Sequence, residues 1–376
     1  MDASSLDLAT AEEASSRLGI SRASLYAYVS RGLIRSFSSP HDPRQRLYAL
    51  EDVETLAERK ARFRRPAVAA ATALDWGLPV LETSITQIRD GRLFYRGQDA
   101  IALAGTATLE EIAHLLIGGL DKDAFNRPSR LPILLAAAAF GPHDFVAQAV
   151  RLLSEPAPKE TRAAEVAAIL RLVAAAASGA DPGTEPLHRH LASAWKAPPR
   201  AAETIRRALV LCADHELSSS AFAVRVTAST GASLRNAVIA GLAALSGPYH
   251  GGMTERFRAY LDNPKTSPSP STRHRLYPEG DPRAAALLQG VPLLASDATT
   301  LRAMTMASNA GPSIDVALVM MERAYGLPVG AAFTLFAIGR TAGWLAHAIE
   351  QRSQATLIRP RARYIATDDP SARTSS

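Results

Sequence analysis

The chain has 376 residues, of which 47% are hydrophobic and only 6% are aromatic. This hydrophobic fraction is ample for a large core and excludes disorder for most of the chain, and the length predicts two or three domains. Lys and Arg number 42 against 36 Asp and Glu, so the net charge is +6, which permits anionic partners without specifying them.

Cys212 is the single cysteine of the sequence, which excludes an internal disulfide and is typical of a reducing cytosol. No thiol-protease signature surrounds it, so we expect a buried structural thiol. The N-terminus begins with an acidic, serine-containing segment instead of a signal peptide, and the longest apolar run, 131–140, is far shorter than the roughly 18–20 residues that span a bilayer. We therefore expect a soluble, cytoplasmic protein that contacts no membrane.

Residues 1–65 are predicted to form a small separate module. Thr10 and Glu13 match a capping box, which predicts a helix that begins there and ends at Gly19. Ser21 can cap a second helix after a short turn, and this spacing is typical of a helix-turn-helix. The second helix is expected at 22–31. Two strands that form a wing follow at 33–37 and 44–48, and a third helix is expected at 50–65.

The segment 25–34, Leu-Tyr-Ala-Tyr-Val-Ser-Arg-Gly-Leu-Ile, is followed by the wing and by Glu-Asp-Val-Glu at 51–54. This pattern resembles the DNA-binding head of MerR-type regulators. The resemblance implies that side chains of the second helix and the wing contact DNA phosphates, which positions a protein without reading sequence. The candidate residues are Arg22, Tyr26, Arg35, Arg44 and Arg46. A small docking or dimerisation module with a solvated basic face is the alternative.

From 66 to about 364 the pattern is helical, and the expected strands are confined to the region around 80–93. Stretches dense in proline and glycine, at 179–186 and 263–270, are predicted to interrupt helices. The tail at 366–376 is polar, and we expect it to be disordered. The composition and pattern together favour an all-α fold.

Six short motifs stand in the helical part, and the most informative is Ser-Gly-Pro-Tyr-His-Gly-Gly at 246–252. It places one imidazole beside two glycines that let a ligand approach the bare backbone. The others are Asp-His-Glu at 214–216, His-Arg-Leu-Tyr-Pro-Glu-Gly-Asp-Pro-Arg at 274–283, Ser-Ile-Asp at 313–315, Gly-Arg-Thr-Ala-Gly-Trp-Leu-Ala-His at 339–347 and Arg-Pro-Arg at 359–361. In this order the set resembles the citrate synthase family, and the resemblance covers roughly 75–364.

The resemblance implies a large helical domain and a small lid domain that closes over the substrate. The expected parts are the N-terminal module at 1–65, the large domain at 66–253 and 326–365, the lid at 254–325 and the tail at 366–376. Only 23 residues separate His250 from His274, where the family has a longer pair of helices, so we expect a shortened lid. In the family the arginine equivalent to Arg359 reaches the neighbouring subunit's site, which implies a homodimer.

The resemblance also implies that acetyl-CoA, or propionyl-CoA as in 2-methylcitrate synthases, condenses with oxaloacetate. Asp315 would take a proton from the acyl carbon, because burial can raise the pKa of a carboxylate. His250 would donate a hydrogen bond to the thioester oxygen, and His274 would polarise the ketone of oxaloacetate. The residues expected to hold oxaloacetate are His215, Arg283, Arg340 and Arg359. Neither a metal nor a cofactor other than the CoA thioester is implied, since imidazoles and arginines stabilise the charge.

Each candidate has a structural alternative. Asp315 could be the N-cap of a helix, since Gly-Pro-Ser-Ile-Asp replaces the family's usual Pro-Asn-Val-Asp. His250 could be a satisfied core histidine. His274 could be a surface histidine in a proline-flanked loop, because Arg273 replaces the family's usual glycine.

Other classes of function stay open. A transcriptional regulator would use the citrate synthase-like part to sense an acyl-CoA or a dicarboxylate, and a dimer would present two heads to palindromic DNA. The shortened lid and the basic head favour this regulator, whereas the complete set of site residues favours the enzyme over a catalytically dead scaffold. His188 and His190 could indicate a metal, but no third ligand has a suitable spacing, and we expect the pair on a solvated helix.

Overall fold

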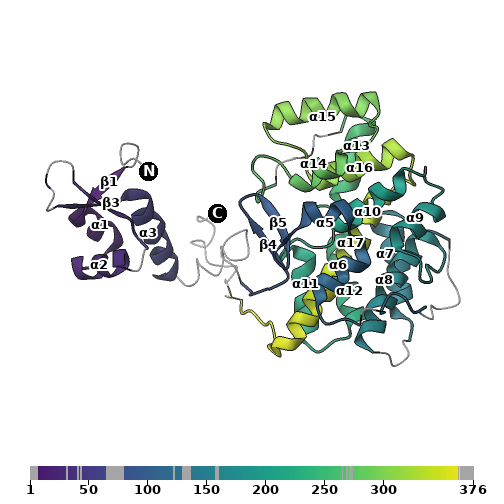
Figure 1. Cartoon of the computed structure of the whole chain (residues 1–376), viewed down its shortest axis with the longest axis horizontal. Helices are drawn as coiled ribbons and strands as arrows, with labels where there is room; N and C mark the ends of the chain where they lie inside the picture. Colours follow the sequence, from purple (N-terminus) through teal and green to yellow (C-terminus); the bar gives the residue numbers. More distant parts are fainter. Residues whose placement is uncertain are drawn as a thin grey trace. The chain divides into compact units, whose positions relative to one another are not determined.

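The structure is a computed structural model that describes most of the chain. The described residues are 7–30, 33–39, 42, 45–64, 80–121, 123–128, 137–156, 161–264, 266–267, 270, 274–362 and 364. The chain divides between Glu82 and Thr83 into two compact units (Figure 1). In the described part of both units, no helix combines the length and the apolar character needed to cross a lipid bilayer.

The first unit pairs a three-stranded antiparallel sheet with three helices. Strand β3 (Arg46–Ala49) lies between β1 (Leu8–Thr10) and β2 (Ser36–Ser38). The helices are α1 (Ala11–Leu18), α2 (Arg22–Ser30) and α3 (Leu50–Arg64). Leu18, Leu25, Ile34, Tyr48 and Val53 form a separate small core.

The capping box that was predicted for the first helix is confirmed. The Thr10 hydroxyl accepts a hydrogen bond from the Glu13 amide, and the Glu13 carboxylate accepts one from the Thr10 amide at 2.8 Å. The helix ends at Gly19, whose φ of 58° is left-handed. The Ser21 hydroxyl accepts a hydrogen bond from the amide of Ser24 at the start of α2. Strand β1 was not predicted, because three residues are too few to show an alternating pattern.

The second unit opens with a small antiparallel sheet and is otherwise helical. Its strands are β4 (Thr86–Arg89), β5 (Arg92–Tyr95) and β6 (Gln98–Asp99). Asp90 and Gly91 connect β4 to β5 with φ values of 52° and 67°, as a two-residue hairpin turn requires. Among the described residues of this unit, the strands are thus those of the predicted region and its short extension to Asp99.

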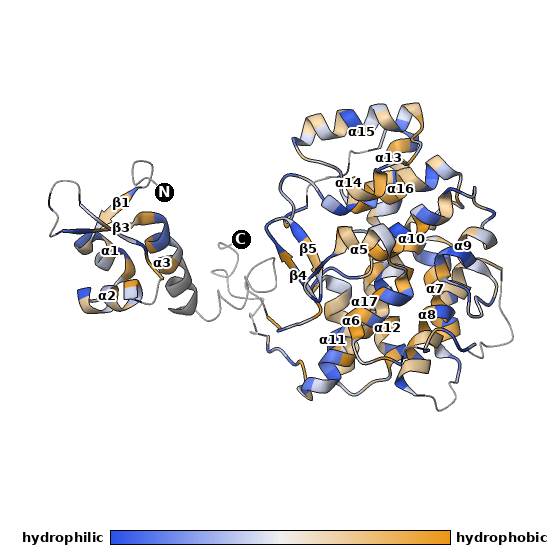
Figure 2. Cartoon of the chain, viewed as in Figure 1, coloured by the Kyte–Doolittle hydropathy of each residue, from blue (hydrophilic) through white to orange (hydrophobic). Residues whose placement is uncertain are grey.

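Helices and the segments that connect them make up the rest of the described part of the second unit, and the all-α class is confirmed. The helices are α5 (Ala100–Thr106), α6 (Leu109–Ile117), the π-helical turn η2 (Gly141–Phe145), α7 (Val146–Ser154), α8 (Arg162–Ser178), α9 (Leu187–Ala194), α10 (Ala201–Leu211), α11 (Ser219–Ser229), α12 (Leu234–Leu245), α13 (Met253–Asp262), α14 (Pro282–Leu288), α15 (Ala295–Ser308), α16 (Ile314–Tyr325) and α17 (Ala331–Gln354). Figure 2 shows hydrophobic stretches on helices in the middle of the unit, such as α8 and α17.

Helix α17 lies at the centre of this unit and is buried from Ala331 to Ala348. Two glycines let neighbouring backbone approach it closely. A Cβ at Gly339 would come within 2.6 Å of the Leu209 carbonyl oxygen, and a Cβ at Gly343 would overlap the Asp214 carboxylate. The segment that follows α10 therefore lies directly against α17.

Three sequence predictions meet different outcomes here. Cys212 is buried, as predicted, and burial raises the pKa of its thiol to about 12. The prediction of a solvated helix for His188 and His190 is wrong, because both are buried on α9 and the His190 ring lies 2.8 Å from the Ser178 hydroxyl. The predicted disordered tail at 366–376 lies outside the described residues.

Candidate active site

The segment 212–216 carries His215 and is fixed from two sides. The Gly343 amide donates to the carbonyl of Ala213 at 3.0 Å, and the His347 ring lies 3.3 Å from the buried Asp214 carboxylate. Burial acts to raise the pKa of Asp214, but His347 outweighs this effect and the pKa is lowered. Glu216 has a left-handed φ of 50° and accepts a hydrogen bond from the Ile88 amide at 2.6 Å. These contacts hold the backbone on which His215 stands.

His215 and His274 lie together around the side chain of Tyr277. The Tyr277 hydroxyl lies 3.0 Å from His215 Nε2, and the rings of His215 and His274 meet edge to face at 5.1 Å. The amide of Leu276 donates to His274 Nδ1 at 3.2 Å. This bond places the proton of a neutral His274 ring on Nε2. His274 is partly buried, so the alternative of an open surface loop is not favoured.

His250 lies at the end of the Ser-Gly-Pro-Tyr motif and contacts α11 and α17. Its Nε2 lies 2.8 Å from the Ser220 hydroxyl, and its ring meets the Phe336 ring edge to face at 6.0 Å. The Ser220 side chain in turn lies 3.3 Å from the Ser218 hydroxyl. A short chain of hydroxyl groups therefore connects His250 to the start of α11.

Arg340 joins this chain from α17. Its Nε donates to the carbonyl of Cys212 at 2.8 Å and its Nη1 donates to the Ser218 hydroxyl at 3.2 Å. The guanidinium also lies over the Phe336 ring, 4.8 Å from its centroid. Only 1% of Arg340 is exposed, so its charge acts inside the protein, where electrostatic interactions are strong.

Arg283 and Asp281 connect the motif at 274–283 to α16. Arg283 is 2% exposed and donates from Nε and Nη2 to the two oxygens of Asp281, at 2.9 and 2.7 Å. The same carboxylate accepts a hydrogen bond from the amide of Ile314 at 3.2 Å. Ile314 precedes Asp315, so this bridge ties the start of α14 to the residue beside the predicted base.

Asp315 lies in the first turn of α16, and the residue at the N-cap is Ser313. The alternative that Asp315 is the N-cap is therefore wrong. Burial raises the pKa of Asp315 to about 6, and the nearby charges of Arg283 and Asp281 act on it with opposite signs. A carboxylate in this environment is a stronger base than one in water.

Burial, reinforced by the charges of Arg283 and Arg340, keeps the three imidazoles neutral. Burial, together with the charges of Arg283 and Arg340, lowers the pKa of His215 well below its usual value. Burial and Arg340 lower the pKa of His250 to about 3, and burial and Arg283 lower that of His274 to about 4. At neutral pH these rings are hydrogen-bond donors without charge, and Asp315 is ionised.

The structure thus gathers six of the predicted residues, which are His215, His250, His274, Arg283, Asp315 and Arg340. The seventh, Arg359, lies on the exposed segment after α17 and joins none of the contacts described above. Sequence reasoning missed the roles of Tyr277, Asp281 and Ser220. The first two lie inside a quoted motif, but only the folded chain shows what they join. Tyr277 contacts His215 and its ring centroid lies 5.6 Å from the Arg283 guanidinium, and Asp281 joins Arg283 to Ile314.

The predicted DNA-contacting residues belong to the first unit, and one of them, Arg44, is outside the described residues. Arg22 and Arg46 are exposed, and Tyr26 is 55% exposed. Arg35 differs, because its Nε and Nη2 each donate to the Asp52 carboxylate at 2.8 Å. This bidentate pair raises the pKa of Arg35 and connects the region of β2 to α3.

No group of three or more His, Cys, Asp or Glu side chains suited to a metal ion occurs among the residues described. The atoms that converge in the site are imidazole nitrogens, guanidinium donors and a carboxylate. This set can bind a carboxylate-bearing substrate, donate hydrogen bonds to developing negative charge and remove a proton.

Comparison with known proteins gives consistent matches. A family model described as citrate synthase, C-terminal domain, matches residues 73–361. A citrate synthase of Haloferax volcanii is 32% identical over 194 residues, which cover 45% of this chain and 51% of the relative. A protein named 2-methylcitrate synthase 2, from Corynebacterium glutamicum, is 30% identical over 183 residues, 42% of this chain and 48% of the relative.

The chain spans about half the length of these curated relatives. The crystal structure of citrate synthase from Thermotoga maritima covers 80% of this chain and 98% of its own, with a TM-score of 0.65 at 23% identity. This last likeness concerns the fold.

Proposed function

The chain belongs to the citrate synthase family, and from this premise we propose that it condenses acetyl-CoA or propionyl-CoA with oxaloacetate to give citrate or 2-methylcitrate and free CoA. The observation that carries the proposal is the gathering of a basic carboxylate, Asp315, with neutral His250 and His274 beside two buried arginines. The single free cysteine suits a cytoplasmic enzyme.

The first step is removal of a proton from the carbon next to the thioester carbonyl. Asp315 accepts this proton, because its pKa of about 6 leaves it ionised at neutral pH yet more basic than an exposed aspartate. The Ser220 hydroxyl can donate to Nε2 of His250, which leaves the ring proton on Nδ1. His250 Nδ1–H then donates to the thioester oxygen as it becomes enolic.

The second step forms the carbon–carbon bond. The enol carbon attacks the ketone carbon of oxaloacetate, and the ketone oxygen becomes an alkoxide that takes a proton. His274 carries its ring proton on Nε2, as the Leu276 amide requires, and donates it to this oxygen. Water then cleaves the product thioester and releases CoA.

The two arginines orient the carboxylates of oxaloacetate. Arg283 uses Nε and Nη2 on Asp281, and Arg340 uses Nε on the Cys212 carbonyl and Nη1 on the Ser218 hydroxyl. A guanidinium has five N–H donors, so Arg283 Nη1 and Arg340 Nη2 are left for the substrate. His215, beside Tyr277, supplies a further neutral hydrogen bond.

The proposed enzyme is a homodimer with a large domain at 66–253 and 326–365 and a shortened lid at 254–325. Arg359 of one subunit completes the site of the other, as its exposed position permits. A mixture of Asp315→Asn and Arg359→Ala chains tests this arrangement. Random pairing of two inactive chains restores one complete site in each mixed dimer, or about a quarter of wild-type activity. No recovery on mixing would exclude the shared site.

Release of free thiol from each acyl-CoA, with and without oxaloacetate, tests the activity. The wild type is expected to release thiol only when oxaloacetate is present, and Asp315→Asn to lower the rate by about 100-fold or more. Asp90→Asn, in an exposed hairpin turn that tolerates Asn, is the matched control and should retain the rate. If neither thioester released thiol in an oxaloacetate-dependent way, the proposal would be refuted.

The N-terminal unit supports a second candidate function, a MerR-like helix-turn-helix that binds DNA and makes the chain a metabolite-sensing regulator. The observation that favours it is a self-contained core with an exposed Arg22, Tyr26 and Arg46 on α2 and the β3 strand. Arg35 would have a structural role instead, because Asp52 holds it.

Binding of the full chain to duplex DNA at several salt concentrations tests this function. Arg22→Ala and Arg46→Ala should weaken binding and reduce its salt dependence by about one counterion each, while Arg92→Ala, in the second unit, should not. Binding that is equal for all three variants would count against the assignment.

A further inference from the structure

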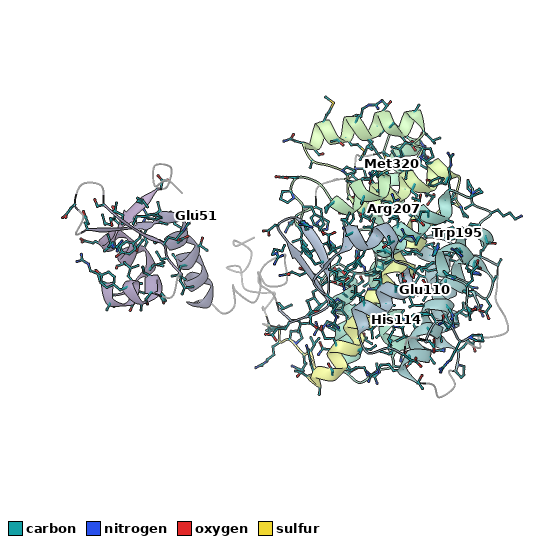
Figure 3. The ribbon with its side chains drawn as sticks, viewed as in Figure 1. Glu51, Glu110, His114, Trp195, Arg207 and Met320 are labelled. Atoms are coloured by element: carbon teal, nitrogen blue, oxygen red, sulfur yellow. The ribbon has the colours of Figure 1, made fainter. Side chains whose placement is uncertain are left out.

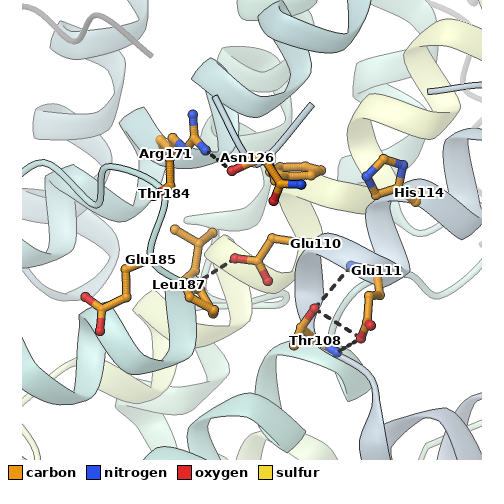
Figure 4. A pocket seen from close by; sticks show the side chains of 11 residues that line it. Thr108, Glu110, Glu111, His114, Asn126, Arg171, Thr184, Glu185 and Leu187 are labelled. Carbon is orange, nitrogen blue, oxygen red and sulfur yellow. Dashed lines mark hydrogen bonds between the residues drawn. The ribbon is translucent and has the colours of Figure 1, made fainter. Parts of the chain in front are cut away.

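A cavity of about 250 Å³ lies at the N-terminal end of α6 and shares no lining residue with the site described above. Its walls come from α6, the segment 123–128, the middle of α8 and the segment that leads into α9 (Figure 4). Glu110 and His114, four residues apart on α6, share one face of that helix (Figure 3).

One carboxylate oxygen of Glu110 is buried in this region without a hydrogen-bond donor among the described residues. Its Oε1 accepts a hydrogen bond from the amide of Leu187 at 2.7 Å, but its Oε2 is buried and has no hydrogen-bond partner in the described part of the chain. Burial raises the pKa of this carboxyl group and outweighs the opposing effects of the Leu187 amide, its own amide, the Thr108 side chain and the charge of Arg171. A buried carboxylate oxygen without a donor is costly, so native proteins rarely leave one unless a water, an ion or a ligand serves it.

The charges around Glu110 are mainly negative. Glu111 uses its carboxylate on the Thr108 amide that begins α6, and Glu185 is half exposed at the rim. The guanidinium among the lining residues belongs to Arg171, which donates to the carbonyls of Phe125 and Arg127 at 2.6 Å each. Three carboxylates and one guanidinium, which donates to backbone carbonyls, therefore line the cavity.

An aromatic wall stands beside these carboxylates. The rings of His114 and Phe125 meet edge to face, with centroids 5.4 Å apart. Figure 4 shows Glu110 between Leu187 on one side and Glu111 on the other, with the His114 ring above Glu111 in this view. A carboxylate next to an aromatic ring is an arrangement that attracts organic cations, because the carboxylate is negatively charged and the face of the ring is electron-rich.

We propose that this cavity binds a small organic cation with a primary ammonium or guanidinium group, which donates a hydrogen bond to Glu110 Oε2 and contacts the ring of Phe125. The cavity volume suits a ligand of a few carbon atoms. The site is distinct from the proposed reaction centre, so it stands whether or not the chain is a synthase.

Calorimetric titration of the full chain with n-butylammonium chloride tests the proposal, with 1-butanol and sodium butyrate as matched neutral and anionic probes. Saturable binding of n-butylammonium is expected, with both other probes weaker by about tenfold or more, because 1-butanol donates a hydrogen bond without a positive charge and butyrate is repelled by the carboxylates. Glu110→Gln should weaken n-butylammonium binding by a similar factor. Glu155→Gln, which removes an exposed carboxylate outside the cavity, should leave binding unchanged.

A second variant, Phe125→Leu, keeps the proposal testable if Glu110→Gln does not fold by circular dichroism. It removes the aromatic face and should weaken binding by about threefold or more. Absence of n-butylammonium binding, equal binding of 1-butanol, or affinities unchanged in both cavity variants would each overturn the proposal.

Discussion

Replacement of Asp315 by Asn is expected to stabilise the fold while it removes the proposed base. Burial raises the pKa of Asp315 from 3.8 to about 6, against the opposing charge of Arg283. A carboxyl group with a higher pKa in the folded state holds its proton more tightly there, so its ionisation at neutral pH destabilises the fold. About two pKa units at about 1.36 kcal/mol each give about 3 kcal/mol, which a neutral Asn would recover.

Chemical denaturation of wild type, Asp315→Asn and the Asp90→Asn control measures this effect. At about pH 7.5 the free energy of unfolding of Asp315→Asn should exceed that of wild type by about 3 kcal/mol, and at about pH 4.5 by only about 1 kcal/mol, because folded Asp315 is then already protonated. The exposed control should change little at either pH. An Asp315→Asn variant that is less stable than wild type at neutral pH, or a difference that does not shrink in acid, would refute the reasoning.

Three further predictions concern the pH profile, the central helix and the first unit. The value of kcat/KM should fall with unit slope below about pH 6, as the proposed base becomes protonated, and a profile that is flat to about pH 5 would contradict that pKa. Gly343→Ala should lower the free energy of unfolding by about 1–3 kcal/mol or more, because the added Cβ would overlap Asp214. Gly105→Ala is the control and should cost nothing, because a Cβ at Gly105 meets nothing within 4 Å. Equal free energies of unfolding for the two variants would contradict the packing of α17 against Asp214. Arg35→Ala should lower the midpoint of the first unit's thermal transition slightly through loss of the Asp52 pair, and an unchanged transition would argue against this role.

Local features could be predicted from the sequence because their causes are local. The capping box of Thr10 and Glu13 and the hairpin turn at Asp90 and Gly91 each depend on residues within three positions of one another. The helical class likewise follows from composition and periodicity. The burial of His190 was missed, since it depends on Ser178 and other distant parts of the chain.

The site could be predicted only as a set of residue types in order. Motifs named His215, Arg283 and Asp315, but no local pattern shows that Tyr277 meets His215 or that Asp281 bridges Arg283 to α16. Contacts of this kind join residues that are tens of positions apart, and they arise when separate helices pack together. The pKa of Asp315 has the same origin, because it depends on burial and on charges from other elements.

The central claim is that the gathered histidines and Asp315 form a new carbon–carbon bond, and the product shows this most directly. We would incubate the full chain with oxaloacetate and acetyl-CoA that carries 13C in the acyl methyl group, and follow the label by NMR. The account predicts that the label appears in the methylene carbon of citrate with the wild type, and at a rate lower by about 100-fold or more with Asp315→Asn. Label that appears only in acetate, or that stays in the thioester, would contradict it.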